Sequence, residues 1–94
     1  MEPTAEQRAQ VPEHVMTRVV DEQLVLLNLD NEEFYGLDEV GTAIWFAVTD
    51  APTIAAAMPR LLEQFDVDAD ILAEDTRTLL QELESRGLVA FAPA

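Results

Sequence analysis

The sequence predicts a small α+β domain in which three antiparallel strands precede three helices, an arrangement like that of a winged helix-turn-helix. In the first 37 residues, apolar side chains either alternate with polar ones or run continuously, as they do in strands. After residue 38 they recur every three or four positions, as they do on the buried face of a helix. The chain has 94 residues, of which 49% are hydrophobic, and this suffices for one domain with one modest core.

The three strands are expected at residues 14–20, 23–29 and 32–37, because turn-forming residues separate these stretches. Asp30 and Asn31 tolerate left-handed backbone and can close a two-residue hairpin that pairs residues 24–29 with 32–37. The third strand is short and directly precedes a helix, so it is expected at the edge of the sheet. An edge strand carries unpaired backbone groups that can accept another extended chain.

The first two helices are expected to begin at N-cap residues, Asp38 and Thr53. The first helix should bury Val40, Ala43, Ile44, Ala47 and Val48, with Trp45 beside them. The second helix has the cleanest period of the chain, made by Ile54, Ala57, Met58, Leu61, Leu62 and Phe65. Pro59 interrupts this period, so the helix either kinks there or has a separate first turn.

The third helix is expected from Asp68 to Arg86, with Gly87 as a left-handed cap. Its core stripe is predicted to consist of Leu72, Thr76, Leu79 and Leu83. The apolar residues 88–91 form either a further strand or a lid on the core. Residues 1–12 are polar and show no period, so they predict a flexible tail, and the folded domain is expected over residues 13–94.

The charge of the chain is strongly acidic. It has 19 acidic residues against five arginines, no lysine, and a net charge of −14. Such a field repels phosphate backbones, which predicts that the protein binds no nucleic acid, and it attracts basic peptides or protein surfaces. The alternative is that the charge only keeps a small protein soluble. The sequence has no apolar run long enough for a membrane span and no signal peptide, so a cytoplasmic protein without membrane association is expected.

The residues needed for catalysis do not converge in this sequence. His14 and Ser85 are the only residues of their types, cysteine is absent, and the glycines are isolated. The alternating acids of Asp66-Val-Asp-Ala-Asp70 lack the glycine and the distal glutamate of a calcium-binding loop. The sequence therefore predicts a protein that is not an enzyme and that uses no metal or cofactor.

Several motifs occur in an order that is typical of one family. The segment after the hairpin reads Tyr35-Gly-Leu-Asp38, then Val40-Gly-Thr42, then Ile44-Trp45. It is followed by the helix that Thr53 caps, by Phe65-Asp-Val-Asp68, by Glu74-Asp75 and by the long helix that ends at Gly87-Leu88. Over roughly residues 11–91 this ordered set resembles the PqqD-like family of peptide-recognition elements in ribosomal natural-product pathways. The spacing is closer to the stand-alone leader-binding proteins of lasso-peptide clusters than to the pyrroloquinoline-quinone protein.

The resemblance implies a non-catalytic chaperone that captures the leader segment of a precursor peptide as an extra antiparallel strand. The captured leader is presented to a partner maturation enzyme, either a leader peptidase or a radical S-adenosylmethionine enzyme. Carried onto this chain, the binding strand consists of Glu32, Glu33, Phe34, Tyr35, Gly36 and Leu37. The helical wall of the groove consists of Leu72, Asp75, Thr76 and Leu79. The acidic members of both sets can pair with a basic leader residue.

Two other functions are weighed against this one. A winged-helix DNA-binding regulator needs a basic recognition helix, whereas residues 70–86 carry five acidic residues against two arginines. A protein–protein adaptor or dimerisation module would use the same sheet edge on itself or on another protein. The sequence leaves the oligomeric state open between monomer and homodimer. Gly36 also has two interpretations, since it either relieves crowding at the edge or admits a second backbone.

Overall fold

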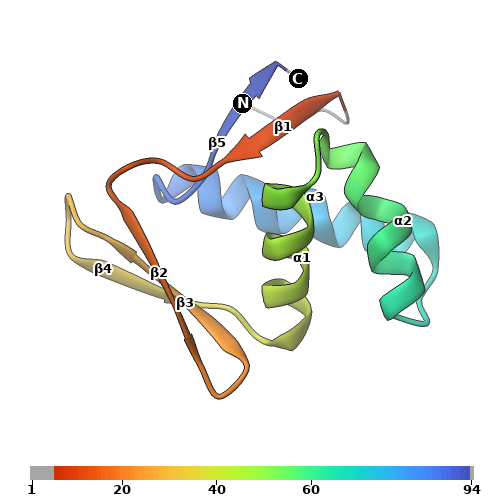
Figure 1. Ribbon diagram of the computed structural model, residues 1–94, viewed down its shortest axis with the longest axis horizontal. Coiled ribbons are helices and arrows are strands. Elements are labelled where there is room, and N and C mark those ends of the chain that lie inside the picture. The colour runs from red at the N-terminus through yellow and green to blue at the C-terminus, as the bar shows by residue number, and fades with distance from the viewer. Residues whose placement is uncertain (1–5, 94) are drawn as a thin grey trace.

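In the computed structural model, which describes residues 6–93, four strands precede three helices and a fifth strand follows them (Figure 1). The strands before the helices are β1 (Gln7–Gln10), β2 (Val15–Val20), β3 (Gln23–Asn28) and β4 (Glu33–Gly36). The helices are α1 (Glu39–Asp50), α2 (Ile54–Gln64) and α3 (Ala69–Ser85), and the last strand is β5 (Ala90–Pro93). The predicted α+β class is confirmed, with a three-stranded antiparallel sheet ahead of three helices.

The main sheet has the order β2-β3-β4, so β4 forms one of its edges, as the sequence predicts. The predicted hairpin register is confirmed as well, since Leu26 pairs with Tyr35 and Asn28 with Glu33. Each strand of this sheet is one or two residues shorter than expected. Leu37 lies beyond β4, but its N–H still donates to the carbonyl of Leu24 at 2.8 Å and continues the ladder.

The predicted two-residue turn is wrong, because strand pairing ends at Asn28 and Glu33 and four residues close the hairpin. Two asparagine side chains form hydrogen bonds within this loop. Asn28 Oδ1 accepts from the N–H of Asp30 at 2.9 Å, and Asn31 Oδ1 accepts from the N–H of Glu33 at 3.0 Å. Glu32 adopts left-handed backbone with φ of 61°, so it belongs to this loop and not to the edge strand.

The second sheet corrects the expectation of a flexible tail. Residues 7–10 form β1 and pair antiparallel with β5, Gln7 opposite Pro93 and Gln10 opposite Ala90. Ala9 is 6% exposed and belongs to the core, which explains why this polar segment is ordered. Residues 1–5, which the predicted tail also includes, lie outside the described residues. The apolar segment after α3 combines the two alternatives, since Leu88 and Val89 pack in the core with 2% and 3% exposure and a strand begins at Ala90.

Helices α1 and α2 start at their predicted caps. Asp38 Oδ1 accepts from the N–H of Gly41 at 2.7 Å, and Thr53 caps α2 through the N–H of Ala56. α1 buries Ile44, Trp45, Ala47 and Val48, whereas Val40 is 42% exposed, contrary to the predicted stripe. Pro59 lies inside one continuous helix, and so α2 has no separate first turn.

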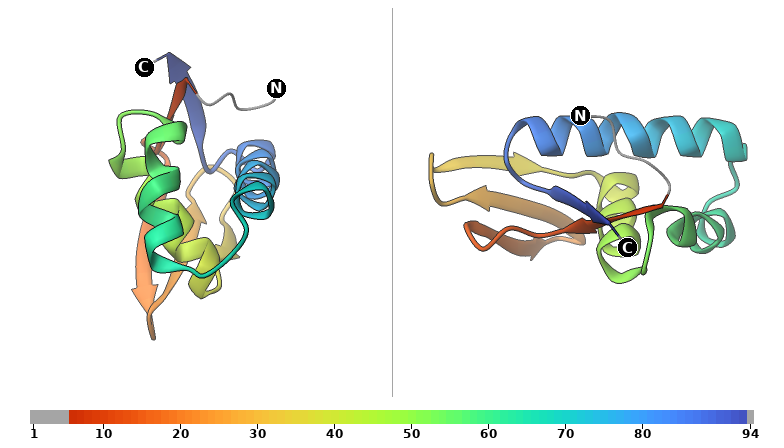
Figure 2. Two further views of the ribbon diagram at one scale, coloured as in Figure 1. Left: turned by 90° about the vertical axis from the view of Figure 1, so that its right-hand side faces the viewer. Right: turned by 90° about the horizontal axis from the view of Figure 1, so that it is seen from above.

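Helix α3 ends in the left-handed cap that the sequence predicts. Gly87 has φ of 72°, its N–H donates to the carbonyl of Glu84, and the N–H of Leu88 donates to that of Leu83. α3 runs past the β4 side of the main sheet, with its C-terminus beside the β3–β4 hairpin (Figure 2). Within residues 6–93, no helix is both long enough and apolar enough to cross a bilayer.

Candidate functional site

The outer edge of β4 offers unpaired backbone groups. Leu37 donates to Leu24 across the hairpin, and the pairing alternates along an antiparallel ladder. Glu33, Tyr35 and Leu37 therefore direct their backbone groups toward β3, while Phe34 and Gly36 direct theirs outward. No other strand of residues 6–93 pairs with this side of β4. Two N–H donors and two carbonyl acceptors are available there to a second extended chain.

A groove lies between β4 and α3, beside this edge. It consists of two cavities of about 650 and 380 Å³, and both are lined by Tyr35, Asp75 and Leu79. We call the larger cavity the α3 end of the groove; it is also lined by Thr78, Gln81, Glu82 and Ser85. We call the smaller cavity the α1 end; it is also lined by Gly36, Leu37, Asp38, Val40, Gly41 and Ile44. The groove thus runs from the C-terminal turns of α3 to the N-terminus of α1.

Tyr35 is held at the centre of the groove by Arg86. The guanidinium carbon of Arg86 lies 5.0 Å from the centroid of the Tyr35 ring, within the range of a cation–π contact. Nε of Arg86 donates to Glu82 Oε1 at 2.8 Å. The hydrogen bond and the charge of Glu82 raise the pKa of Arg86 above its ordinary value, with smaller contributions from Tyr35 and Glu33. The guanidinium therefore stays charged where it covers the ring.

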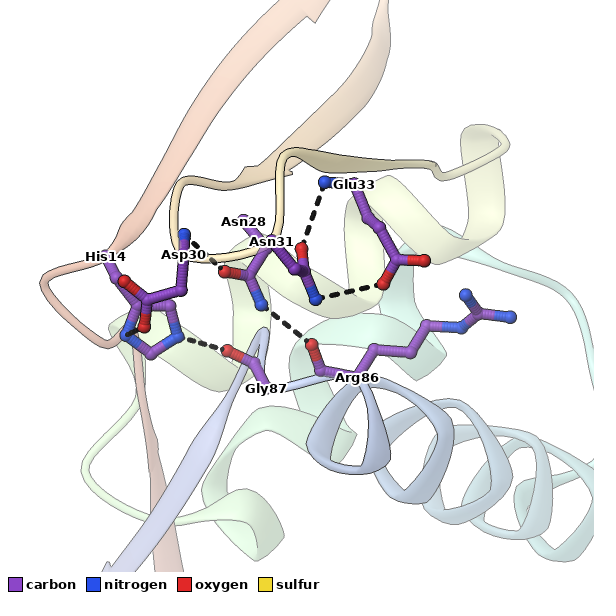
Figure 3. A network of polar contacts seen from close by, with 7 residues as sticks. All are labelled: His14, Asn28, Asp30, Asn31, Glu33, Arg86 and Gly87. Carbon is purple, nitrogen blue, oxygen red and sulfur yellow. Dashed lines mark hydrogen bonds and ion pairs between the residues drawn. The ribbon is translucent and has the colours of Figure 1, made fainter.

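A second set of contacts fixes the C-terminus of α3 against the β3–β4 hairpin (Figure 3). Asn28 Nδ2 donates to the carbonyl of Arg86 at 3.0 Å, and His14 Nε2 donates to that of Gly87 at 2.8 Å. A carbonyl oxygen only accepts, so Nε2 of His14 carries a proton. His14 Nδ1 lies 3.7 Å from Asp30 Oδ2. The only histidine of the chain thus helps to hold the two walls of the groove together.

Half of the predicted site residues line the groove: Tyr35, Gly36, Leu37, Asp75 and Leu79. Glu33 and Phe34 are exposed on β4, and their side chains line neither cavity. Glu32 lies in the hairpin loop.

The predicted place in the groove wall is wrong for Leu72 and Thr76, which are 3% and 1% exposed and line neither cavity. Their predicted place in the core stripe of α3 is confirmed, as is that of Leu83. In this stripe Leu80 takes the place of Leu79, since Leu80 is fully buried while Leu79 is only partly buried. Thr76 Oγ1 has no hydrogen-bond partner among residues 6–93.

The sequence analysis missed the polar residues of α3 that continue the groove wall. Thr78, Glu82 and Ser85 follow Asp75 at intervals of three or four residues, which places them on the same side of the helix. Extending the helical period from Asp75 toward the C-terminus would have found them. Val40 and Ile44 were assigned to the core stripe of α1, and they also line the α1 end of the groove.

No metal site competes with the groove in the described part of the chain. Within residues 6–93, no three histidine, cysteine, aspartate or glutamate side chains are placed to hold a metal ion. One further ion pair lies away from the groove, since Arg60 pairs with Asp50 at 3.0 Å between exposed surfaces of α1 and α2.

Comparisons with known proteins agree with this geometry. The family model described as Coenzyme PQQ synthesis protein D (PqqD) matches residues 23–89. The solved structure "TbiB1 in Complex with the TbiA(beta) Leader Peptide" is similar with a TM-score of 0.79 and 25% identity, over 85% of this chain and 93% of that one. A second structure, "Lasso peptide synthetase B1 complexed with the leader peptide", has a TM-score of 0.78 and 21% identity, over 92% of this chain and 99% of that one. No curated protein matches the chain. The family match covers most of the sequence and confirms the resemblance that its motifs carry: the chain belongs to the PqqD family.

Proposed function

We propose that this protein is a non-catalytic peptide-binding chaperone that captures the leader segment of a ribosomally made precursor peptide. One observation carries the proposal: the unpaired edge of β4 lies directly beside a groove that α3 closes on its other side. Membership of the PqqD family supports it, as does the similarity to TbiB1, whose solved structure is named as a complex with a leader peptide.

The leader binds as a fourth strand of the main sheet, antiparallel to β4. The outward backbone groups of Phe34 and Gly36 form the hydrogen bonds, which provide affinity without regard to sequence. Side chains alternate along a strand, so every second leader residue faces the groove. Those residues lie opposite Glu33, Tyr35 and Leu37, and their fit to the two ends of the groove provides specificity.

The role of this protein is to present the leader to a partner maturation enzyme that performs the chemistry. A leader peptidase of a lasso-peptide pathway is the better candidate, because one of the two similar solved structures is a lasso peptide synthetase B1 in complex with a leader peptide. A radical S-adenosylmethionine enzyme, as in pyrroloquinoline-quinone synthesis, is the alternative partner. We expect the protein to act in the cytoplasm, where precursor peptides are synthesised, without a cofactor of its own.

A binding titration tests the proposal. Fluorescently labelled leader peptides from the precursor genes beside this one are titrated with the protein, and anisotropy is followed at two salt concentrations. Saturable binding of one leader is expected. Its affinity should be lower at the higher salt concentration, because salt screens the attraction between the acidic protein and a basic leader. If the folded protein binds none of these leaders, the proposal is wrong. Size-exclusion chromatography of the same samples then tests the adaptor or dimerisation alternative.

A further inference from the structure

The α1 end of the groove combines polar and apolar surface. Its apolar part comes from Leu37 and Ile44, which are 4% and 2% exposed, and from Val40, which is 42% exposed. Two acidic residues line this end, and Asp75 is shared with the other cavity. Asp38 is already engaged, since its carboxylate accepts from the N–H of Gly41 at 2.7 Å. A peptide side chain that enters beside Leu37 and Val40 therefore meets carbon atoms and an occupied carboxylate, which favours an apolar residue.

The middle of the groove contains an unpaired carboxylate. Asp75 is exposed, lines both cavities, and makes no hydrogen bond or ion pair with any residue between positions 6 and 93. Leu79 and Tyr35 line the same cavities and provide apolar surface next to it. Lysine and arginine suit such a place, because their stems pack on apolar surface while the charged end reaches a carboxylate.

Two other charges near the middle are paired with each other. Glu82 is paired with Arg86 at 2.8 Å, and the guanidinium of Arg86 covers the ring of Tyr35. Arg86 is therefore already neutralised by Glu82 and leaves Asp75 available. The net charge of −14 adds a long-range attraction for a basic peptide and disfavours an acidic one.

If the leader binds as a strand beside β4, the apolar part of the α1 end and the carboxylate of Asp75 each select a particular position in the leader sequence. Leader residues opposite Leu37 and Tyr35 face the groove and lie two positions apart, because side chains alternate along a strand. In an antiparallel leader the residue opposite Leu37 comes first. We infer that the groove selects a leader segment with an apolar residue followed two positions later by lysine or arginine. The inference rests on the proposed leader binding and specifies which leader residues it recognises and in which direction.

Double-mutant cycles with the leader that binds in the titration test the basic position. Asp75→Asn should weaken binding about two- to fivefold at low salt, as expected for an exposed ion pair. The effect should shrink at high salt. One basic leader residue, changed to glutamine, should abolish the sensitivity to Asp75→Asn. Glu74→Gln is the matched control, since Glu74 is an exposed acid of α3 that lines neither cavity, and it should leave affinity unchanged.

The apolar position is mapped in the same way. Val40→Ser removes an exposed methyl pair and should couple to one apolar leader residue, two positions before the basic residue identified through Asp75. Three outcomes would overturn the inference while leader binding itself persists. The two leader residues could occur in the reverse order, Asp75 could couple to no basic residue, or the leader could lack a basic residue at that place. Failure of the folded wild-type protein to bind any leader would instead overturn the proposed function, and the inference with it.

Discussion

Arg86 and Tyr35 stack with the guanidinium carbon 5.0 Å from the ring centroid, and this contact joins the end of α3 to the edge strand. The backbone of Arg86 makes a second connection, because its carbonyl accepts from Asn28 Nδ2 at 3.0 Å. One residue thus holds the helix to the hairpin through both its side chain and its main chain. The groove between them is formed before any peptide binds, which lowers the ordering cost of binding.

Replacing Arg86 by glutamine should weaken leader binding severalfold with little loss of stability. The guanidinium is exposed, so its removal costs the fold little, but Tyr35 loses the group that covers its ring. Anisotropy gives the affinity, and the NMR shifts of the Tyr35 ring report its position. Arg60→Gln is the control, since Arg60 pairs with Asp50 away from the groove. Equal effects of both variants would mean that Arg86 contributes only net charge.

Replacing Gly36 by proline should reduce leader affinity more than tenfold while the protein remains folded. The N–H of Gly36 points away from β3, so proline removes a donor for the leader and leaves the β3–β4 ladder intact. Gly36→Ala is the control, because an added Cβ there meets no atom within 4 Å. Circular dichroism checks the fold of both variants. Unchanged affinity of the proline variant would rule out strand addition at β4.

Adjacent leucines of α3 should separate stability from binding. Leu80 is fully buried, so Leu80→Ala should cost roughly 2–5 kcal/mol of unfolding free energy in urea titrations. Leu79 is only partly buried and lines the groove, and Leu79→Ala should cost less stability. Its leader affinity should fall about tenfold or more, since the apolar contact it offers is worth about 1.5–3 kcal/mol when fully buried. A larger stability loss at Leu79 than at Leu80 would contradict this assignment.

Removing the Asn28 side chain should destabilise the fold. Asn28 is 5% exposed, donates to the carbonyl of Arg86 and accepts from the N–H of Asp30. Asn28→Ala leaves these part-buried groups without partners and should cost roughly 1–3 kcal/mol in urea denaturation. Asn31→Ala is the matched control, because its two hydrogen bonds are exposed and local. It should change stability by no more than about 0.5 kcal/mol, and a comparable loss at both positions would refute the role given to Asn28.

The parts of the fold that local chemistry determines were predictable. The caps Asp38 and Thr53 and the left-handed Gly87 act on their own helices, so each is visible within a few residues of sequence. The register of β3 and β4 could be predicted by pairing residues symmetrically about Asp30 and Asn31. This register is correct although the loop has four residues and not the predicted two. The four-residue loop was not predicted, and in it Asn28 and Asn31 accept from the N–H groups of Asp30 and Glu33.

The parts that depend on distant segments were not predictable. β1 has only Ala9 in the core, and its partner β5 lies at the other end of the chain, so neither period nor composition signals it. The groove wall shows the same limitation. Leu79 and Leu80 both fit the apolar side of α3, and only the placement of the sheet decides that Leu80 enters the core while Leu79 faces the groove. For the same reason Leu72 and Thr76, correctly predicted in the core stripe, were wrongly assigned to the groove wall as well.

The pairing of Gln7 with Pro93 also determines how the molecule should respond to mechanical force. In this antiparallel pair, the start of β1 and the end of β5 lie together, so tension applied at these two points loads the hydrogen bonds one after another. Such an unzipping geometry resists little, whereas shearing would load all the bonds at once. The small sheet would therefore yield first, and β4, α3 and the groove between them would stay intact until the pull reached the main sheet.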